Sequence, residues 1–156
     1  MSKLGFLVAV SVVSLGAAVG AWYYKYQLYG WLPSTASSEL KNVDGLLMDK
    51  EGKPFTGRVK DISDSGYSLY AYKDGKLYGL NVVFSEGQLR EIGHWENGEQ
   101  NGLFEAWTDK GVLVDHGIFK DGERDGETVQ YWPDTGKLKV KAQYRAGKLN
   151  GLVEQY

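Results

Sequence analysis

Four stretches of the chain repeat one short phrase: Tyr72-Lys-Asp-Gly-Lys-Leu-Tyr-Gly79, Trp95-Glu-Asn-Gly-Glu-Gln-Asn-Gly102, Phe119-Lys-Asp-Gly-Glu-Arg-Asp-Gly126 and Tyr144-Arg-Ala-Gly-Lys-Leu-Asn-Gly151. Each reads aromatic-x-x-Gly-x-x-x-Gly, and the first glycines are 23, 24 and 25 residues apart. A looser fifth copy at residues 50–57 has an extra residue between its two glycines. Self-similarity at this period predicts a repeat architecture, in which each unit packs on its neighbours.

The residues between the glycine pairs are typical of strands. The predicted first strands of the repeats are residues 80–84, 103–107, 127–131 and 152–156, and the second strands are 88–95, 112–119 and 137–144. Asp-Gly and Asn-Gly between such runs indicate tight hairpins, because both residues tolerate positive φ. We therefore predict an all-β fold over residues 45–156, an elongated antiparallel meander of about five β-hairpin repeats. Its predicted turn glycines are Gly75, Gly79, Gly98, Gly102, Gly122, Gly126, Gly147 and Gly151.

A small residue lies two places before the repeat aromatic in the last three copies. These residues are Gly93, Gly117 and Ala142. We expect each to leave room for an aromatic side chain of a neighbouring strand, such as Phe84, Trp107 or Tyr131.

Residues 4–24 carry no charge and are flanked by Lys3 and Lys25. As a helix this segment would be about 31 Å long, enough for a bilayer core of about 30 Å. Aromatic residues, which favour the headgroup layer, follow at once. We predict one N-terminal transmembrane helix within residues 1–25, a linker over 26–44, and repeats on the non-cytoplasmic (periplasmic) side. The alternative is a signal peptide, with secretion after cleavage. Gly16 and Gly20, one turn apart, mark a possible helix contact in a homodimer.

Composition argues against several functions. The formal net charge of −2 is too small to suggest nucleic-acid binding, and there is no cysteine. No nucleophile elbow, phosphate loop or Ser/His/Asp set is present, and His94 and His116 occupy non-equivalent places in their repeats. We predict a non-enzyme with no catalytic residues, no cofactor and no metal site.

The stretch Gly93-His-Trp95-Glu-Asn-Gly98-Glu-Gln-Asn-Gly102-Leu-Phe-Glu-Ala-Trp107 resembles a MORN (membrane occupation and recognition nexus) repeat. More closely, it resembles the bacterial variant found in YwqK-like antitoxin proteins. The resemblance covers roughly residues 45–156 and implies β-hairpin repeats in an elongated, twisted sheet. The roles that it implies are protein–protein contact, membrane-proximal scaffolding and, in bacteria, neutralising a partner toxin.

Three functions remain open at this point. The first is a membrane-tethered protein-binding or scaffolding module that presents Trp107, Tyr131 and Trp132 to an unidentified protein partner, because Trp and Tyr are frequent at binding hot spots. Trp132 follows the repeat position Tyr131, so we expect Trp132 to face outward. The second is a glycan or cell-wall binder. The third is contact with anionic lipid through Lys137, Lys139 and Lys141, whose alternation predicts one shared strand face.

Overall fold

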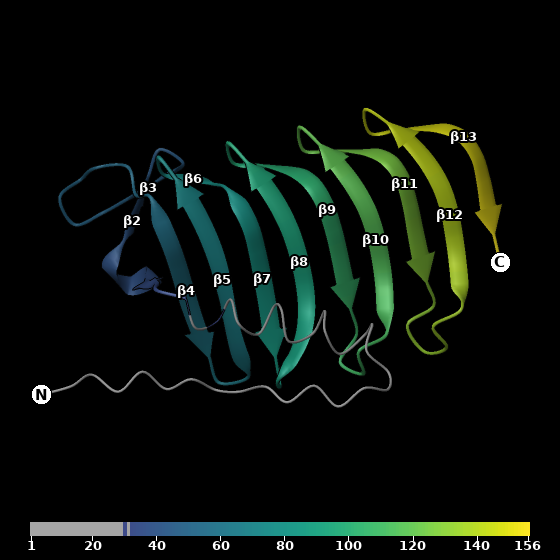
Figure 1. The fold of residues 1–156 in the computed structure, drawn as a ribbon, viewed down its shortest axis with the longest axis horizontal. Helices are drawn as coiled ribbons and strands as arrows, with labels where there is room; N and C mark the ends of the chain where they lie inside the picture. The colour runs from purple at the N-terminus through teal and green to yellow at the C-terminus, as the bar shows by residue number, and fades with distance from the viewer. Residues whose placement is uncertain (1–29, 31) are drawn as a thin grey trace, which may run out of the picture.

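The computed structural model describes Gly30 and residues 32–156, and these residues form an all-β fold, as predicted (Figure 1). The one helical element in the described part is a short 3-10 turn, η1 (Ser37–Glu39). The predicted membrane anchor at residues 4–24, with Gly16 and Gly20, lies outside the described residues. Within the described part, no helix is long and apolar enough to cross a membrane.

One long sheet contains most of the strands, and they follow one another in chain order. Its path is β1 (Thr35–Ala36), β4 (Gly57–Ser63), β5 (Gly66–Lys73), β7 (Gly79–Ser85), β8 (Gln88–Glu96), β9 (Glu99–Trp107), β10 (Leu113–Lys120), β11 (Glu123–Tyr131), β12 (Leu138–Arg145) and β13 (Lys148–Gln155), with β6 (Lys76–Leu77) paired beside β5. Neighbours from β4 to β13 pair antiparallel. Figure 1 shows these strands side by side along the long axis of the protein.

The first glycine of each phrase occupies a two-residue hairpin turn. It follows a residue that also has positive φ: Asp74 (51°) and Gly75 (79°), Asn97 (53°) and Gly98 (91°), Asp121 (50°) and Gly122 (80°), Ala146 (47°) and Gly147 (70°). Positive φ at both central residues is the requirement of a type I′ turn, whose twist matches that of the flanking strands. The hairpin prediction was therefore correct at these glycines.

The second glycine of the later phrases lies inside a strand. Gly102, Gly126 and Gly151 have φ of 119°, 126° and 133° within β9, β11 and β13. The pairing of each strand with its predecessor shifts register close to that glycine. Glycine tolerates the backbone conformation of such a bulge, so the strand continues through it. These strands therefore begin earlier than predicted: β9 starts at Glu99 and not at residue 103.

The predicted linker over residues 26–44 contributes strands at the N-terminal end of the sheet. β1 pairs in parallel with β4, which makes the long sheet mixed. β2 (Lys41–Val43) and β3 (Leu46–Met48) form a separate hairpin around Asp44 and Gly45. Both β1 and β2 are short and polar and have no apolar alternation, so sequence periodicity gives no sign of them.

The apolar core lies toward the N-terminal half of the sheet. Its buried members are Leu69, Val82, Phe84, Leu89 and Ile92, and the half-buried Tyr67, Leu80, Leu103 and Trp107 pack against them. Leu69, Val82 and Ile92 are laterally paired on β5, β7 and β8, so their side chains share one face. In β13, by contrast, every residue is exposed.

Ala146→Asn should stabilise the protein, because Ala146 is a non-glycine residue at φ 47° in a turn where two other repeats have Asp and one has Asn. A left-handed conformation costs an ordinary L-residue about 1–2 kcal/mol, and Asn is one of the few side chains that tolerate it. We expect a gain of about 0.5–1 kcal/mol in thermal unfolding followed by circular dichroism. The reverse change, Asn97→Ala in the equivalent turn, should cost a similar amount. Equal melting temperatures for all three proteins would contradict this.

Candidate interaction surface

The three aromatic residues predicted to meet a partner have different environments. Trp107 packs against the apolar core, and Tyr131 is half buried at the end of β11. Trp132 lies in the loop between β11 and β12 and is 42% exposed. Its indole Nε1 donates a hydrogen bond of 3.4 Å to the backbone oxygen of Tyr156, and the Lys139 ammonium is 4.7 Å from the centroid of its ring. Trp132 is thus the exposed one of the three.

Trp132 forms part of a small surface at the C-terminal end of the sheet. Trp132, Lys137, Leu138 and Tyr156 line an open hollow of about 320 Å³. We call these four residues and Lys139 the C-terminal platform. It combines two aromatic rings with two ammonium groups. Such a surface suits contact with a protein, because Trp and Tyr contribute large rigid contact areas.

A β-bulge lies within the stretch of β12 that contains the alternating Lys139 and Lys141 and follows Lys137. Leu138 pairs with Tyr131 and Val140 pairs with Gln130, so two steps along β12 span one step along β11. This bulge interrupts the alternation at Lys139. The three ammonium groups have different surroundings: Lys137 borders the hollow, Lys139 lies over Trp132, and Lys141 pairs with Glu127 at 2.9 Å. The hydrogen bond from Lys141 to Glu127 raises the pKa of that lysine.

Exposed apolar side chains gather toward the same end of the protein. Of the nine large exposed ones in the described part of the chain, six come after residue 117: Ile118, Trp132, Leu149, Leu152, Val153 and Tyr156. They lie on β10, on β13 and around the platform. The largest cluster of buried apolar residues lies on β5, β7 and β8, so the C-terminal end has more exposed apolar surface to offer a partner.

The groups that lie next to Gly93 and Gly117 differ from the predicted aromatic side chains Phe84, Trp107 and Tyr131. A Cβ added at Gly93 would lie 3.1 Å from the Trp95 indole Nε1 and 3.7 Å from the ring of Phe104. A Cβ added at Gly117 would lie 2.5 Å from the Arg124 guanidinium. The space at Gly93 is therefore bordered by Trp95 of its own strand, by the Gln100 amide at 3.5 Å and by Phe104 of the neighbouring strand, whereas Phe84 and Trp107 belong to the apolar core.

A polar network around Gly117 is a feature that the sequence did not reveal. Arg124 donates hydrogen bonds to Asp115 (2.6 Å) and to Thr128 (3.1 Å), and its guanidinium lies 4.9 Å from the ring centroid of Phe119. Thr128 is buried, and Asp115 Oδ1 is buried without a hydrogen-bond partner in the structure. Arg124 occupies a variable position between the two glycines of its phrase, so the repeat pattern gives no signal for it.

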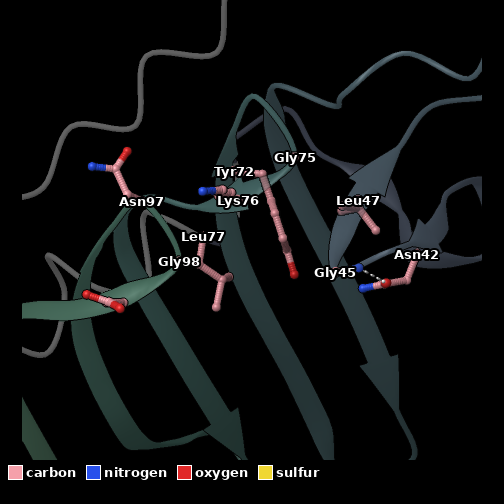
Figure 2. A pocket seen from close by; sticks show the side chains of 10 residues that line it. Asn42, Gly45, Leu47, Tyr72, Gly75, Lys76, Leu77, Asn97 and Gly98 are labelled. Atoms are coloured by element: carbon pink, nitrogen blue, oxygen red, sulfur yellow. Dashed lines mark hydrogen bonds between the residues drawn. The ribbon is translucent and has the colours of Figure 1, made fainter. Parts of the chain in front are cut away.

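A second open hollow, of about 410 Å³, lies at the N-terminal end (Figure 2). The ring of Tyr72 stands between the β2–β3 hairpin, which contributes Asn42 and Leu47, and the turn at Gly98 (Figure 2). Burial raises the pKa of the Tyr72 phenol. The hollow is the gap between neighbouring turns, and the titratable residues of its lining are Tyr72, Lys76 and Glu99.

The histidines lie apart from the platform and from each other. His116 on β10 contacts the Glu105 carboxylate at 2.9 Å, and His94 on β8 lies 3.4 Å from the Leu103 carbonyl. Across the described residues, no group of three or more His, Asp or Glu side chains is placed to hold a metal ion. These contacts fit histidines that support neighbouring strands.

Glu91→Gln should stabilise the protein at neutral pH. Glu91 lies on β8 opposite Val83 and Ala106, and burial raises the pKa of its carboxyl group. The folded state therefore binds the proton more tightly than the unfolded state, and stability falls as the pH rises from the ordinary glutamate pKa through the raised one. Because Glu91 is only half buried, we expect a gain of about 1–2 °C in melting temperature at pH 7. The gain should vanish below pH of about 4, where both side chains are neutral. A gain independent of pH would contradict this.

Comparison with known proteins gives no assignment: no protein-family model matches the chain, and no curated protein matches its sequence.

Proposed function

We propose that this protein is a non-catalytic, membrane-tethered repeat protein of the MORN type, which binds a protein partner through its C-terminal platform. The observation that supports this most is Trp132, a large aromatic side chain that is held by Tyr156 and Lys139 and yet is 42% exposed. Because its position is fixed before binding, a partner that covers it would lose little further conformational freedom. The exposed apolar residues around it supply further contact area.

The tether and the repeat class rest on the sequence. The uncharged segment 4–24 suits an anchor, which would place the repeats on the periplasmic side of the membrane. The resemblance to MORN and YwqK-like repeats suggests two roles, scaffolding and neutralisation of a partner toxin. A membrane anchor favours scaffolding, because it confines the partner to the membrane surface.

The test compares two exposed aromatic residues of equal exposure. The tagged full-length protein is purified from its own host in mild detergent as the parent, as Trp132→Ala and as Tyr78→Ala, whose side chain is also 42% exposed. We expect one stoichiometric companion protein with the parent and with Tyr78→Ala, and at least a tenfold loss with Trp132→Ala, as for a hot-spot residue worth about 1.4 kcal/mol or more. A companion that persists with Trp132→Ala, or no companion with the parent, would contradict the proposal.

A further inference from the structure

The two ends of the long sheet differ in how their edges are covered. At the N-terminal end, β1 pairs with the outer edge of β4. The β2–β3 hairpin lies on the next turn, where the Leu47 amide donates to the Gly75 carbonyl at 2.9 Å. At the C-terminal end, β13 pairs with β12 alone among the described strands. Its outer edge therefore presents backbone amides and carbonyls that can accept another strand.

The pairing between consecutive repeats follows one rule throughout the sheet. The second glycine of a repeat lies opposite the aromatic residue of the next: Gly57 and Tyr72, Gly79 and Trp95, Gly102 and Phe119, Gly126 and Tyr144. From Gly79 onward, the residue two places after that glycine lies opposite a small one: Asn81 and Gly93, Phe104 and Gly117, Thr128 and Ala142. In the first, looser repeat, Val59 lies opposite Tyr70 instead.

A backbone hydrogen bond completes each contact. The backbone amide of the turn glycine in one repeat donates this bond to a carbonyl of the preceding repeat. The accepting carbonyl belongs to the residue two places before the second glycine of that preceding repeat. The pairs are Phe55 and Gly75 (2.8 Å), Leu77 and Gly98 (2.9 Å), Gln100 and Gly122 (2.9 Å), and Arg124 and Gly147 (3.0 Å). Each repeat from Gly79 onward thus contacts the next one through three groups: its second glycine, a side chain opposite a small residue, and a backbone carbonyl.

β13 presents the same three groups without a following repeat among the described residues. They are the carbonyl of Leu149, then Gly151, whose φ of 133° resembles that of Gly102 and Gly126, and then Val153. Val153 is 43% exposed, whereas the equivalent Asn81 and Thr128 are 4% and 3% exposed. The edge of β13 therefore presents the same backbone and side-chain groups that each inner repeat uses to pair with the next repeat.

We propose that the outer edge of β13 binds a strand–turn segment of another protein, antiparallel, with the pattern small-x-aromatic-x-x-Gly. The small residue lies opposite Val153, the aromatic ring lies over Gly151, and the amide of the turn glycine donates to the Leu149 carbonyl. Strand addition of this kind takes its affinity from backbone hydrogen bonds and its specificity from alternate side chains. A second copy of β13 does not fit this pattern. If its Tyr156 lay opposite Gly151, its Glu154 would lie opposite Val153, where the pattern requires a small residue.

This inference deepens the proposed function, since it describes how a protein partner binds beside the platform. The probe is a fluorescent synthetic peptide with the sequence of residues 112–122 of this chain, which contains Gly117, Phe119 and Gly122 in the required spacing. The full-length protein in detergent is titrated into it, and binding is followed by fluorescence anisotropy. Two control peptides carry Phe119→Ala, which removes the ring, or Gly117→Val, which adds bulk opposite Val153.

We expect saturable binding that is weakened at least about tenfold by either peptide change. In the protein, Val153→Lys should weaken binding by a similar factor, and Ile62→Lys on the distant β4, 79% exposed, should not. Hydrogen exchange of the β13 amides should slow when the peptide is bound. Absence of saturable binding, equal binding of the three peptides, or an unchanged affinity with Val153→Lys would overturn the inference.

Failure of this inference and failure of the proposed function are distinguishable. Trp132→Ala should still bind the peptide, because Trp132 is not on the edge of β13. A partner lost with Trp132→Ala, together with no peptide binding, would retain the proposed function and remove the edge site.

Discussion

Gly66→Ala should destabilise the sheet more than the same change at any other strand glycine with ordinary φ. An added Cβ at Gly66 would overlap the carbonyl oxygen of Phe84 and lie 2.8 Å from both the Phe84 carbonyl carbon and the Ser85 Cα. These are backbone atoms of the paired strand β7, so no rotamer change can relieve the overlap. We expect a loss of about 3 kcal/mol or more, at the upper end of overpacking substitutions.

Gly117 and Gly93 allow a graded comparison with Gly66, because an added Cβ at these two glycines would meet side-chain atoms and not backbone atoms. At Gly117 the Cβ would meet the Arg124 guanidinium at 2.5 Å and displace it from its network, for a loss of about 1–3 kcal/mol. At Gly93 the nearest atom is the Trp95 indole Nε1 at 3.1 Å, and the loss should stay below about 1 kcal/mol because alanine also restricts the unfolded chain. Urea unfolding should therefore rank the damage as Gly66, Gly117, Gly93. Equal losses at the three sites would contradict this steric explanation.

The repeat pattern allowed the turns and the fold class to be predicted because both depend on local residues. Asp74, Asn97 and Asp121 before their glycines indicate positive φ without any tertiary information. The starts of β9, β11 and β13 were missed for a related reason. Gly102, Gly126 and Gly151 also suggest turns, but lateral pairing with the preceding strand holds them in bulges.

The candidate surface could be predicted only in part. Adjacency to Tyr131 correctly placed Trp132 outward, because neighbouring residues of an extended chain point to opposite sides. The shared lysine face stays a prediction, and the bulge in β12 beside Lys139 has no signal in the sequence. The contact of Trp132 with Tyr156 joins residues that lie 24 positions apart, and no sequence pattern links them.

The N-terminal end shows the same limit. Thr35 and Ala36 have no strand signal of their own, and β1 exists because the outer edge of β4 offers unpaired backbone groups. The different pairing of the β4 and β13 edges among the described strands is thus a consequence of topology. Sequence periodicity describes the repeats but not how an array ends.

Arg124→Met should be the second severe substitution, because it removes the centre of the network around Gly117. Arg124 and Asp115 side chains are only 22% and 20% exposed, and their 2.6 Å contact is the shortest hydrogen bond of the network. One oxygen of Asp115, the buried Oδ1, already lacks a hydrogen-bond partner in the structure, so loss of Arg124 would leave this partly buried carboxylate without its ion-pair partner. Breaking such a pair from one side costs about 3–5 kcal/mol when it is fully buried, and we expect about 2–4 kcal/mol here.

A double-mutant cycle separates the ion pair from the packing of the arginine side chain. Asp115→Asn combined with Arg124→Met should be less damaging than the sum of the two single changes by about 1–3 kcal/mol, because the double variant no longer buries an unpaired charge. The matched control is the exposed pair of Lys50 and Glu39, 65% and 47% exposed, where Lys50→Met should change stability by less than about 0.5 kcal/mol. Strict additivity in the cycle would show that Arg124 acts through packing alone, and an equal loss at Lys50 would contradict the effect of burial on the Asp115–Arg124 pair. The non-additive result would instead show that the Asp115–Arg124 ion pair itself stabilises this part of the sheet. Arg124 would then occupy the space above Gly117, as Trp95, Gln100 and Phe104 do above Gly93.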